Sequence, residues 1–229
     1  MNFIKPTTIG LVAILAVLLT SCGNTSDKTS EKNQKDSIAK SEILYVEDFA
    51  QFKSHDDLVA RFGEKEVIKG ERYIEEGTVK VLVSIVYPES NHPLTVFWKA
   101  GQNQYKDIQS VEVSKMLYDK DSKIIIAEDN YWKFKNGLNI GMTIQELQKL
   151  NGGPFKFFGL GWDFGGSVLA ENKIFENYSM TLGYVTTDDS KMPKSYYDIN
   201  GDMELKSDNK IANELPLKLV NIEYHFVQN

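Results

Sequence analysis

Two short segments of this 229-residue chain carry complete helix-capping signals, and they limit how the rest of the chain can fold. The first has Ser54 as a candidate N-cap and stops at Gly63. The second opens with the capping box formed by Thr143 and Glu146 and stops at Gly152. Helices of two to three turns are unstable alone. The remaining residues must therefore supply a surface on which both helices pack.

Strand-forming residues dominate that remainder. The segments densest in β-branched and aromatic residues are 78–87, 94–98, 111–115, 122–127, 155–158, 179–186 and 217–227. In the last, Ile222, Tyr224 and Phe226 alternate with polar residues, as in a half-buried strand. Few short helices among meandering strands predict an α+β fold with antiparallel sheet.

The apolar stripes of the two helices predict where the core lies. Leu58 and Phe62 in the first segment, and Leu147 and Leu150 in the second, recur at helical spacing. All four side chains are expected to be nearly inaccessible, because such short helices persist only by burying that stripe.

The amino-terminal residues predict export and a lipid anchor. Lys5 precedes an apolar run from Ile9 to Leu19, which is shorter than the about 20 residues that a membrane-spanning helix needs. The run ends in Leu-Thr-Ser-Cys22, which resembles the lipobox of bacterial lipoproteins. The resemblance implies cleavage of residues 1–21, a diacylglycerol thioether on Cys22 and acylation of its amino group. An ordinary secretory signal with a chance cysteine is the alternative.

Residues 22–42 are expected to form the lipidated cysteine and a disordered tether, because the stretch is almost wholly polar. Gly23 occupies the position where enteric bacteria place Asp to retain lipoproteins in the inner membrane, so outer-membrane anchoring, on either face, is favoured. The total charge is −6, and the signal contributes +1 and the tether none, which leaves −7 on the body. An acidic body argues against a nucleic-acid partner. With one cysteine, an internal disulfide framework and a cysteine-rich zinc site are excluded.

The body is predicted to contain two related helix-plus-sheet units, residues 43–135 and 136–229. Sliding the sequence on itself by 89 residues superposes several positions of similar character. These pairs include Ser54 with Thr143, Tyr73 with Trp162, Gly77 with Gly166 and Val79 with Val168.

The run from Gly141 to Pro154 resembles a motif of the small outer-membrane lipoprotein in the barrel-assembly machinery (BamE, the SmpA/OmlA family). It is also similar to tandem-helix domains with the fold of the β-lactamase inhibitor protein, and the whole chain resembles uncharacterised lipoproteins of the Bacteroidota. The motif departs from that family at Asn151, which separates the leucine from the glycine. The resemblance implies short helices on a sheet and a role in binding or assembly.

Residues 155–166 contain five aromatic residues and four glycines. The segment lacks the third glycine of a dinucleotide fingerprint, and the chain has no Walker loop. One interpretation is a pair of core strands joined by a glycine hairpin. The other is an aromatic contact surface on a flexible turn, with Trp162 as anchor, Asp163 as polar orienter and Phe164 beside them. Tyr73, aligned with Trp162, would then give a second contact point.

Motifs for catalysis or metal binding are weak. Residues 198–204 are similar to a calcium loop, but Met203 replaces its glycine and Asn209 its glutamate, so a solvated turn is favoured. The three histidines, His55, His92 and His225, lack ligand spacing, and no cofactor is expected.

The sequence therefore predicts a non-enzymatic, lipid-anchored binding or assembly module of the cell envelope with a protein or peptide partner. An inhibitor of an envelope-directed enzyme is an alternative within the same class. A hydrolase is the alternative from another class, with a carboxylate site among Asp163, Asp188, Asp189 and Asp198.

Overall fold

The computed structural model describes residues 44–74, 77–101, 104–118, 124–127, 131–169 and 171–227. The signal, Cys22 and the tether predicted for residues 1–42 lie outside the described residues.

The described chain forms eleven strands and eight short helices, and the first six strands follow one another without a helix between them. The strands are β1 (Val67–Ile74), β2 (Val79–Val86), β3 (Leu94–Trp98), β4 (Ile108–Ser114), β5 (Met116–Tyr118), β6 (Ile124–Ile126), β7 (Lys156–Phe158), β8 (Val168–Leu169), β9 (Tyr178–Tyr184), β10 (Glu204–Lys206) and β11 (Leu217–His225). The α-helices are α2 (His55–Phe62), α3 (Ile144–Asn151), α4 (Lys194–Tyr197) and α5 (Lys210–Glu214). The 3₁₀ helices are η1 (Val46–Gln51), η2 (Glu64–Glu66), η3 (Lys173–Phe175) and η4 (Asp189–Lys191).

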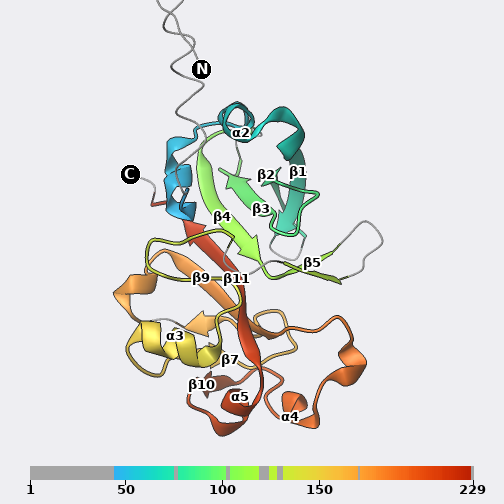
Figure 1. Cartoon of the computed structure of the whole chain (residues 1–229), viewed down its shortest axis with the longest axis vertical. Coiled ribbons are helices and arrows are strands. Elements are labelled where there is room, and N and C mark those ends of the chain that lie inside the picture. Colours follow the sequence, from blue (N-terminus) through green and yellow to red (C-terminus); the bar gives the residue numbers. More distant parts are fainter. Residues whose placement is uncertain are drawn as a thin grey trace, which may run out of the picture. The chain divides into compact units, whose positions relative to one another are not determined.

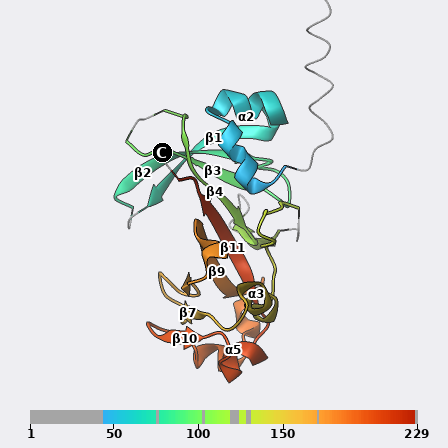
Figure 2. The same ribbon diagram turned by 90° about the vertical axis from the view of Figure 1, so that its left-hand side faces the viewer.

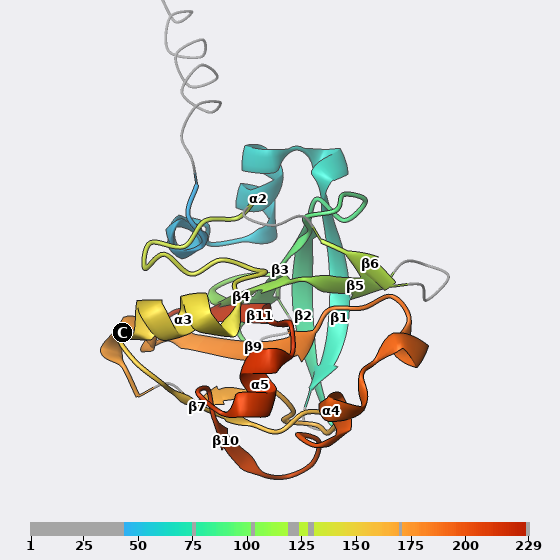
Figure 3. The same ribbon diagram turned by 60° about the horizontal axis from the view of Figure 1, so that its bottom comes forward.

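A six-stranded antiparallel sheet with the order β1-β2-β3-β4-β11-β9 organises the body (Figure 1). A three-stranded sheet, β10-β7-β8, and the β5–β6 hairpin complete the strands. The large sheet is strongly twisted, so that β1 and β2 run across the direction of β9 and β11 (Figure 3). The predicted α+β class with antiparallel sheet is confirmed.

Two adjacent rows of residues show how the six-stranded sheet divides its faces. The first row crosses all six strands and is apolar and buried throughout: Val67, Val86, Leu94, Val113, Ile222 and Met180. The second row lies one residue along each strand and points to the opposite face, because side chains alternate along a strand. It runs Ile68, Ile85, Thr95, Glu112, Glu223 and Ser179. The core therefore covers one face of the sheet and leaves a mixed apolar and polar row on the other.

The two predicted helices form with the predicted caps. In α2, the Ser54 hydroxyl accepts from the Asp57 backbone N–H at 3.3 Å, and Asp57 accepts from the Ser54 N–H at 3.0 Å. The same exchange joins Thr143 and Glu146 at the start of α3, at 3.2 Å and 2.8 Å. The C-cap Gly152 is left-handed, with φ of 80°.

Burial of the helix stripes follows the prediction at the two central leucines. Leu58 and Leu147 are 0% exposed. Phe62 and Leu150 are only half-buried and pack on the margin of the core. Both of these lie in the last turn of their helix, so full burial was a wrong prediction for them.

Both helices lie on the core side of the large sheet. α2 contacts β1 and β2, and α3 contacts β11 (Figure 2). Within the described residues, no helix combines the length and apolar character required to cross a membrane.

The predicted tandem units are not separate bodies, since Glu42–Asn229 clusters as one compact unit. β4 from the first predicted unit pairs with β11 from the second. Some local features recur in both: a capped helix precedes a hairpin, and Gly77 and Gly166 both have positive φ, 84° and 78°, just before the second strand. The hairpins differ, because β1 and β2 have eight residues each whereas β7 has three and β8 two. A duplication stays a prediction.

Candidate binding surface

The aromatic segment forms a loop between β7 and β8. Phe157 in β7 is 0% exposed and faces the core, so its neighbour Phe158 faces outward. Two backbone hydrogen bonds hold the loop: the Gly159 N–H donates to the Met203 carbonyl at 2.8 Å, and the Leu160 N–H donates to the Ile199 carbonyl at 2.8 Å. The loop is therefore tied to the segment that leads into β10.

The loop glycines permit close packing against neighbouring backbone, a role that the sequence did not predict for them. A Cβ on Gly159 would lie 2.6 Å from the Gly201 carbonyl oxygen. Gly166 has φ of +78°, and a Cβ there would lie 1.9 Å from the Leu182 carbonyl oxygen. Real Cβ atoms do not approach backbone that closely, so these positions require glycine. The two glycines therefore bring the loop into close contact with two other segments, around Gly201 and around Leu182.

Trp162 lies half-buried at the centre of the loop. Its indole Nε1 donates to the Gly159 carbonyl at 2.8 Å. Its ring meets Phe158 edge to face at a centroid distance of 5.5 Å and Phe164 at 5.3 Å. Phe164 is 61% exposed, and Asp163 between them is exposed. The loop thus presents an aromatic pair that is held in place before any partner arrives.

Tyr73 is also exposed, at 64%, but it lies in β1 opposite Lys80. Beside it, Lys80 forms an exposed ion pair with Glu71 at 3.0 Å. Among the described residues, no ring contact joins Tyr73 to the loop around Trp162. The structure therefore brings together three of the four predicted partner-binding residues, and places the fourth on another sheet.

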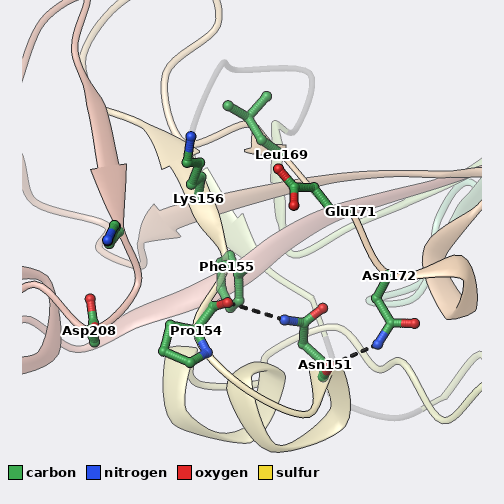
Figure 4. A pocket seen from close by; sticks show the side chains of 9 residues that line it. Asn151, Pro154, Phe155, Lys156, Leu169, Glu171, Asn172 and Asp208 are labelled. Carbon is green, nitrogen blue, oxygen red and sulfur yellow. Dashed lines mark hydrogen bonds between the residues drawn. The ribbon is translucent and has the colours of Figure 1, made fainter.

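A cavity of 480 Å³ lies at the other end of β7 and was not predicted (Figure 4). Its lining is mostly polar and comes from three segments of the chain: Asn151, Pro154, Phe155, Lys156, Leu169, Glu171, Asn172, Lys206 and Asp208. Two of the polar side chains that line the cavity are engaged by other groups of the protein. Asn172 donates through its side-chain amide to the Asn151 carbonyl at 2.7 Å, and Lys156 pairs with Glu204 at 2.8 Å. Sequence spacing gave no signal for it, because its residues are far apart along the chain.

Of the carboxylates in the hydrolase hypothesis, those that the structure describes line neither of its two described cavities. A second cavity, of 430 Å³, lies beside His55 and Lys69. Neither described cavity is lined by Asp163, Asp188 or Asp198, and the side chain of Asp189 lies outside the described part of the structure.

Asp188 is instead engaged locally. It accepts from the Ser190 hydroxyl at 2.6 Å and pairs with Lys191 at 3.1 Å. These bonds lower the pKa of the Asp188 carboxyl.

The residues similar to a calcium loop form a turn between α4 and β10, with Gly201 at positive φ. Across the part of the chain that the structure describes, no cluster of three or more His, Cys, Asp or Glu side chains is placed to hold a metal ion.

A hydroxyl–imidazole pair on the open face of the large sheet was not predicted from the sequence. The Ser179 Oγ lies 2.8 Å from His225 Nε2, and His225 Nδ1 lies 3.8 Å from Glu223 Oε1. The first distance is a hydrogen bond and the second is too long for one. Ser179 and His225 are 46 positions apart in the sequence, so no local pattern predicts the pair. The β9–β11 register brings the two side chains together.

No protein-family model, curated protein or solved structure matches this chain.

Proposed function

We propose that this chain is a non-enzymatic binding or assembly module of the bacterial envelope, anchored in the outer membrane through lipid on Cys22. Its proposed contact surface is the loop that carries Trp162, Asp163 and Phe164. The proposal of a lipid anchor rests on the sequence alone, on the apolar run that ends at Cys22.

The observation that carries the contact surface is the exposed and fixed position of the aromatic pair. Phe164 is 61% exposed although its ring packs against that of Trp162, with the two ring centroids 5.3 Å apart. An aromatic group held by its neighbours loses little conformational entropy on binding. Tight packing of Gly159 and Gly166 against other backbone makes the loop a preformed projection.

The same rigidity favours the second candidate, an inhibitor of an envelope-directed enzyme. Inhibitors of enzymes commonly present preformed segments whose backbone moves little on binding. Under this alternative, Phe164 enters a cleft of the target enzyme.

Photocrosslinking in the envelope tests the contact surface. A photoreactive phenylalanine analogue in place of Phe164 should crosslink the full-length protein to a discrete partner on irradiation. The same analogue at Tyr197, which is also 61% exposed, is the matched control. Equal crosslinking patterns at both positions, or none at Phe164, would remove the loop as the contact surface. An inhibitor is distinguished when the captured partner is an enzyme whose activity the purified protein suppresses.

The anchor has its own test. Cys22→Ser should move the protein from the washed membrane fraction to the soluble fraction, because the thioether lipid cannot form. Retention of the variant in membranes would contradict the anchor without bearing on the loop.

A further inference from the structure

A row of side chains on the face of the large sheet opposite the core changes from apolar to acidic as it crosses the strands. Its first member, Ile68, is 44% exposed, and Ile85 beside it is half-buried. Further along the row, Glu112 of β4 lies directly opposite Glu223 of β11. None of the six residues in the row belongs to the hydrophobic core.

The two glutamates form a close pair of like charges in a partly desolvated place. Opposite residues of antiparallel strands have Cβ atoms about 4.5–5.5 Å apart, and like charges placed there repel. Burial raises the pKa of the Glu112 carboxyl, and the charge of Glu223 raises it further. The hydrogen bond from Asn221 Nδ2, at 3.2 Å, acts in the other direction. Arg72, an exposed residue on the same face, also lowers this pKa, but it has the smallest of these effects.

A second feature of this face is an unused hydroxyl group. Ser110 lies two residues before Glu112 on β4, so its side chain points to the same face. The residue is 1% exposed, and its Oγ has no hydrogen-bond partner within the described part of the chain. A buried hydroxyl without a partner costs free energy that a suitably placed ligand group recovers. His225, which lies opposite Ser110 and keeps 43% of its side chain exposed, borders the same place.

We propose that this face binds a protein segment that places an arginine or lysine side chain between Glu112 and Glu223 and an apolar side chain against Ile68 and Ile85. Charge complementarity selects the cation, since it relieves the repulsion between the two carboxylates. The apolar end of the row selects a peptide over a small inorganic cation. This surface is independent of the Trp162 loop.

Two peptides and full-length protein in non-ionic detergent test the proposal. The probes are acetyl-Leu-Arg-Phe-amide and its citrulline analogue, which keeps the shape of arginine and lacks its charge. Binding is followed through the NMR signals of the glutamate side-chain carboxyl carbons and of the β4 and β11 amides. The arginine peptide should shift the signals of Glu112 and Glu223. The citrulline peptide should bind with an affinity about tenfold lower, or lower still.

Neutral variants separate this site from general acidity. Glu112→Gln with Glu223→Gln should weaken binding of the arginine peptide about tenfold or more, whereas Glu214→Gln, an exposed acid on α5, should not. The double variant should unfold at the same urea concentration as the parent or a higher one, because the repulsion is gone. Equal binding of both peptides, the absence of shifts at saturating peptide, or equal shifts with Mg²⁺ alone would overturn the proposal. Phe164→Ala should change none of these results, so failure here is separable from failure of the aromatic loop.

Discussion

The indole Nε1 of Trp162 donates a hydrogen bond to the carbonyl oxygen of Gly159, at 2.8 Å. This bond joins two residues of the same loop, three positions apart, and the ring that it holds meets the Phe164 ring in a T-shaped contact. The polar atom of the indole is therefore used inside the protein. Only the carbon surface of the ring remains for a partner.

Removing that bond should loosen the loop without unfolding the body. Trp162→Phe keeps an aromatic ring but leaves the Gly159 carbonyl with only the longer bond from the Gly166 N–H, at 3.3 Å. The expected cost is about 0.5–1.5 kcal/mol in the free energy of unfolding. Urea denaturation measures the loss, and photocrosslinking from position 164 should weaken in parallel. A loss comparable with that of a fully buried aromatic, about 3–5 kcal/mol, would instead assign Trp162 to the core.

Gly166 and Gly77 offer a matched pair of substitutions, because both have positive φ and only one is crowded. Alanine at Gly77 meets nothing within 4 Å, so Gly77→Ala should cost only the backbone strain, about 1–2 kcal/mol. The Cβ of an alanine at position 166 would lie 1.9 Å from the Leu182 carbonyl oxygen. Gly166→Ala should therefore lower the free energy of unfolding by about 3 kcal/mol or more. Urea unfolding of both variants makes the comparison, and similar losses would show that contact with β9 does not hold the loop.

Local sequence signals predicted the elements whose causes are local. The capping boxes at Ser54 and Thr143 fix where α2 and α3 begin, and β3 spans the predicted 94–98. β1 was missed because its sequence, VIKGERYI, is charged and exposed along most of its length. It becomes a strand only because β2 offers eight opposing residues in register. Tertiary pairing supplied what propensity did not.

The buried leucine of α3 predicts a large loss of stability. Leu147→Ala should lower the free energy of unfolding by about 2–5 kcal/mol, since the side chain is 0% exposed. Leu150→Ala, one turn further in the same helix, removes the same atoms from a half-buried position and should cost clearly less. Denaturation midpoints that fail to separate these two variants would contradict the orientation of α3.

His55 predicts an acid-sensitive component of stability. Burial lowers the pKa of this imidazole and the charge of Lys69 lowers it further, while Asp56 acts in the other direction. Its Nδ1 lies 2.8 Å from the Ser84 Oγ, which accepts from Trp98 Nε1 at 2.8 Å, so Ser84 can donate to a neutral His55. The folded protein binds a proton at this site less readily than the unfolded chain. The contribution of His55 to the free energy of unfolding is fully present above pH 6.5, the ordinary pKa of an imidazole. It decreases as the pH falls below that value, because the unfolded chain then binds a proton at His55 and the folded protein does not.

His55→Gln should therefore flatten the dependence of the urea midpoint on pH between about pH 7 and pH 5. His225→Gln, at a position with 43% of its side chain exposed, is the control and should leave the dependence in place. An unchanged slope in His55→Gln would show that the imidazole titrates as freely in the folded protein as in the unfolded chain.

Ser179 tests the proposal that the protein is not an enzyme. Glu223 Oε1 lies 3.8 Å from the imidazole that would activate this hydroxyl, too far to orient it. A fluorophosphonate probe, which labels activated serines, should leave the protein unmodified. Labelling that disappears in Ser179→Ala would identify a hydrolase and withdraw the proposal.

The candidate surfaces illustrate which parts of a site can be foreseen from sequence. Trp162, Asp163 and Phe164 are consecutive, so their clustering follows directly from their positions in the chain. Glu112 and Glu223 are distant in sequence and meet only through the β4–β11 register. No local pattern marks such a pair, because each glutamate alone is typical of an ordinary polar position on a strand.

The place of β11 in the large sheet also determines when the protein can fold. β11, the last strand among the described residues, lies between β4 and β9 and completes both pairings. A chain that emerges amino end first from a ribosome or a translocation channel cannot close this sheet until Leu217–His225 is free. Until then, the edges of β4 and β9 that will pair with β11 have unpaired backbone N–H and carbonyl groups, and such edges are prone to aggregation. Pairing of β11 with β4 and β9 is thus the step that joins the two sides of the large sheet.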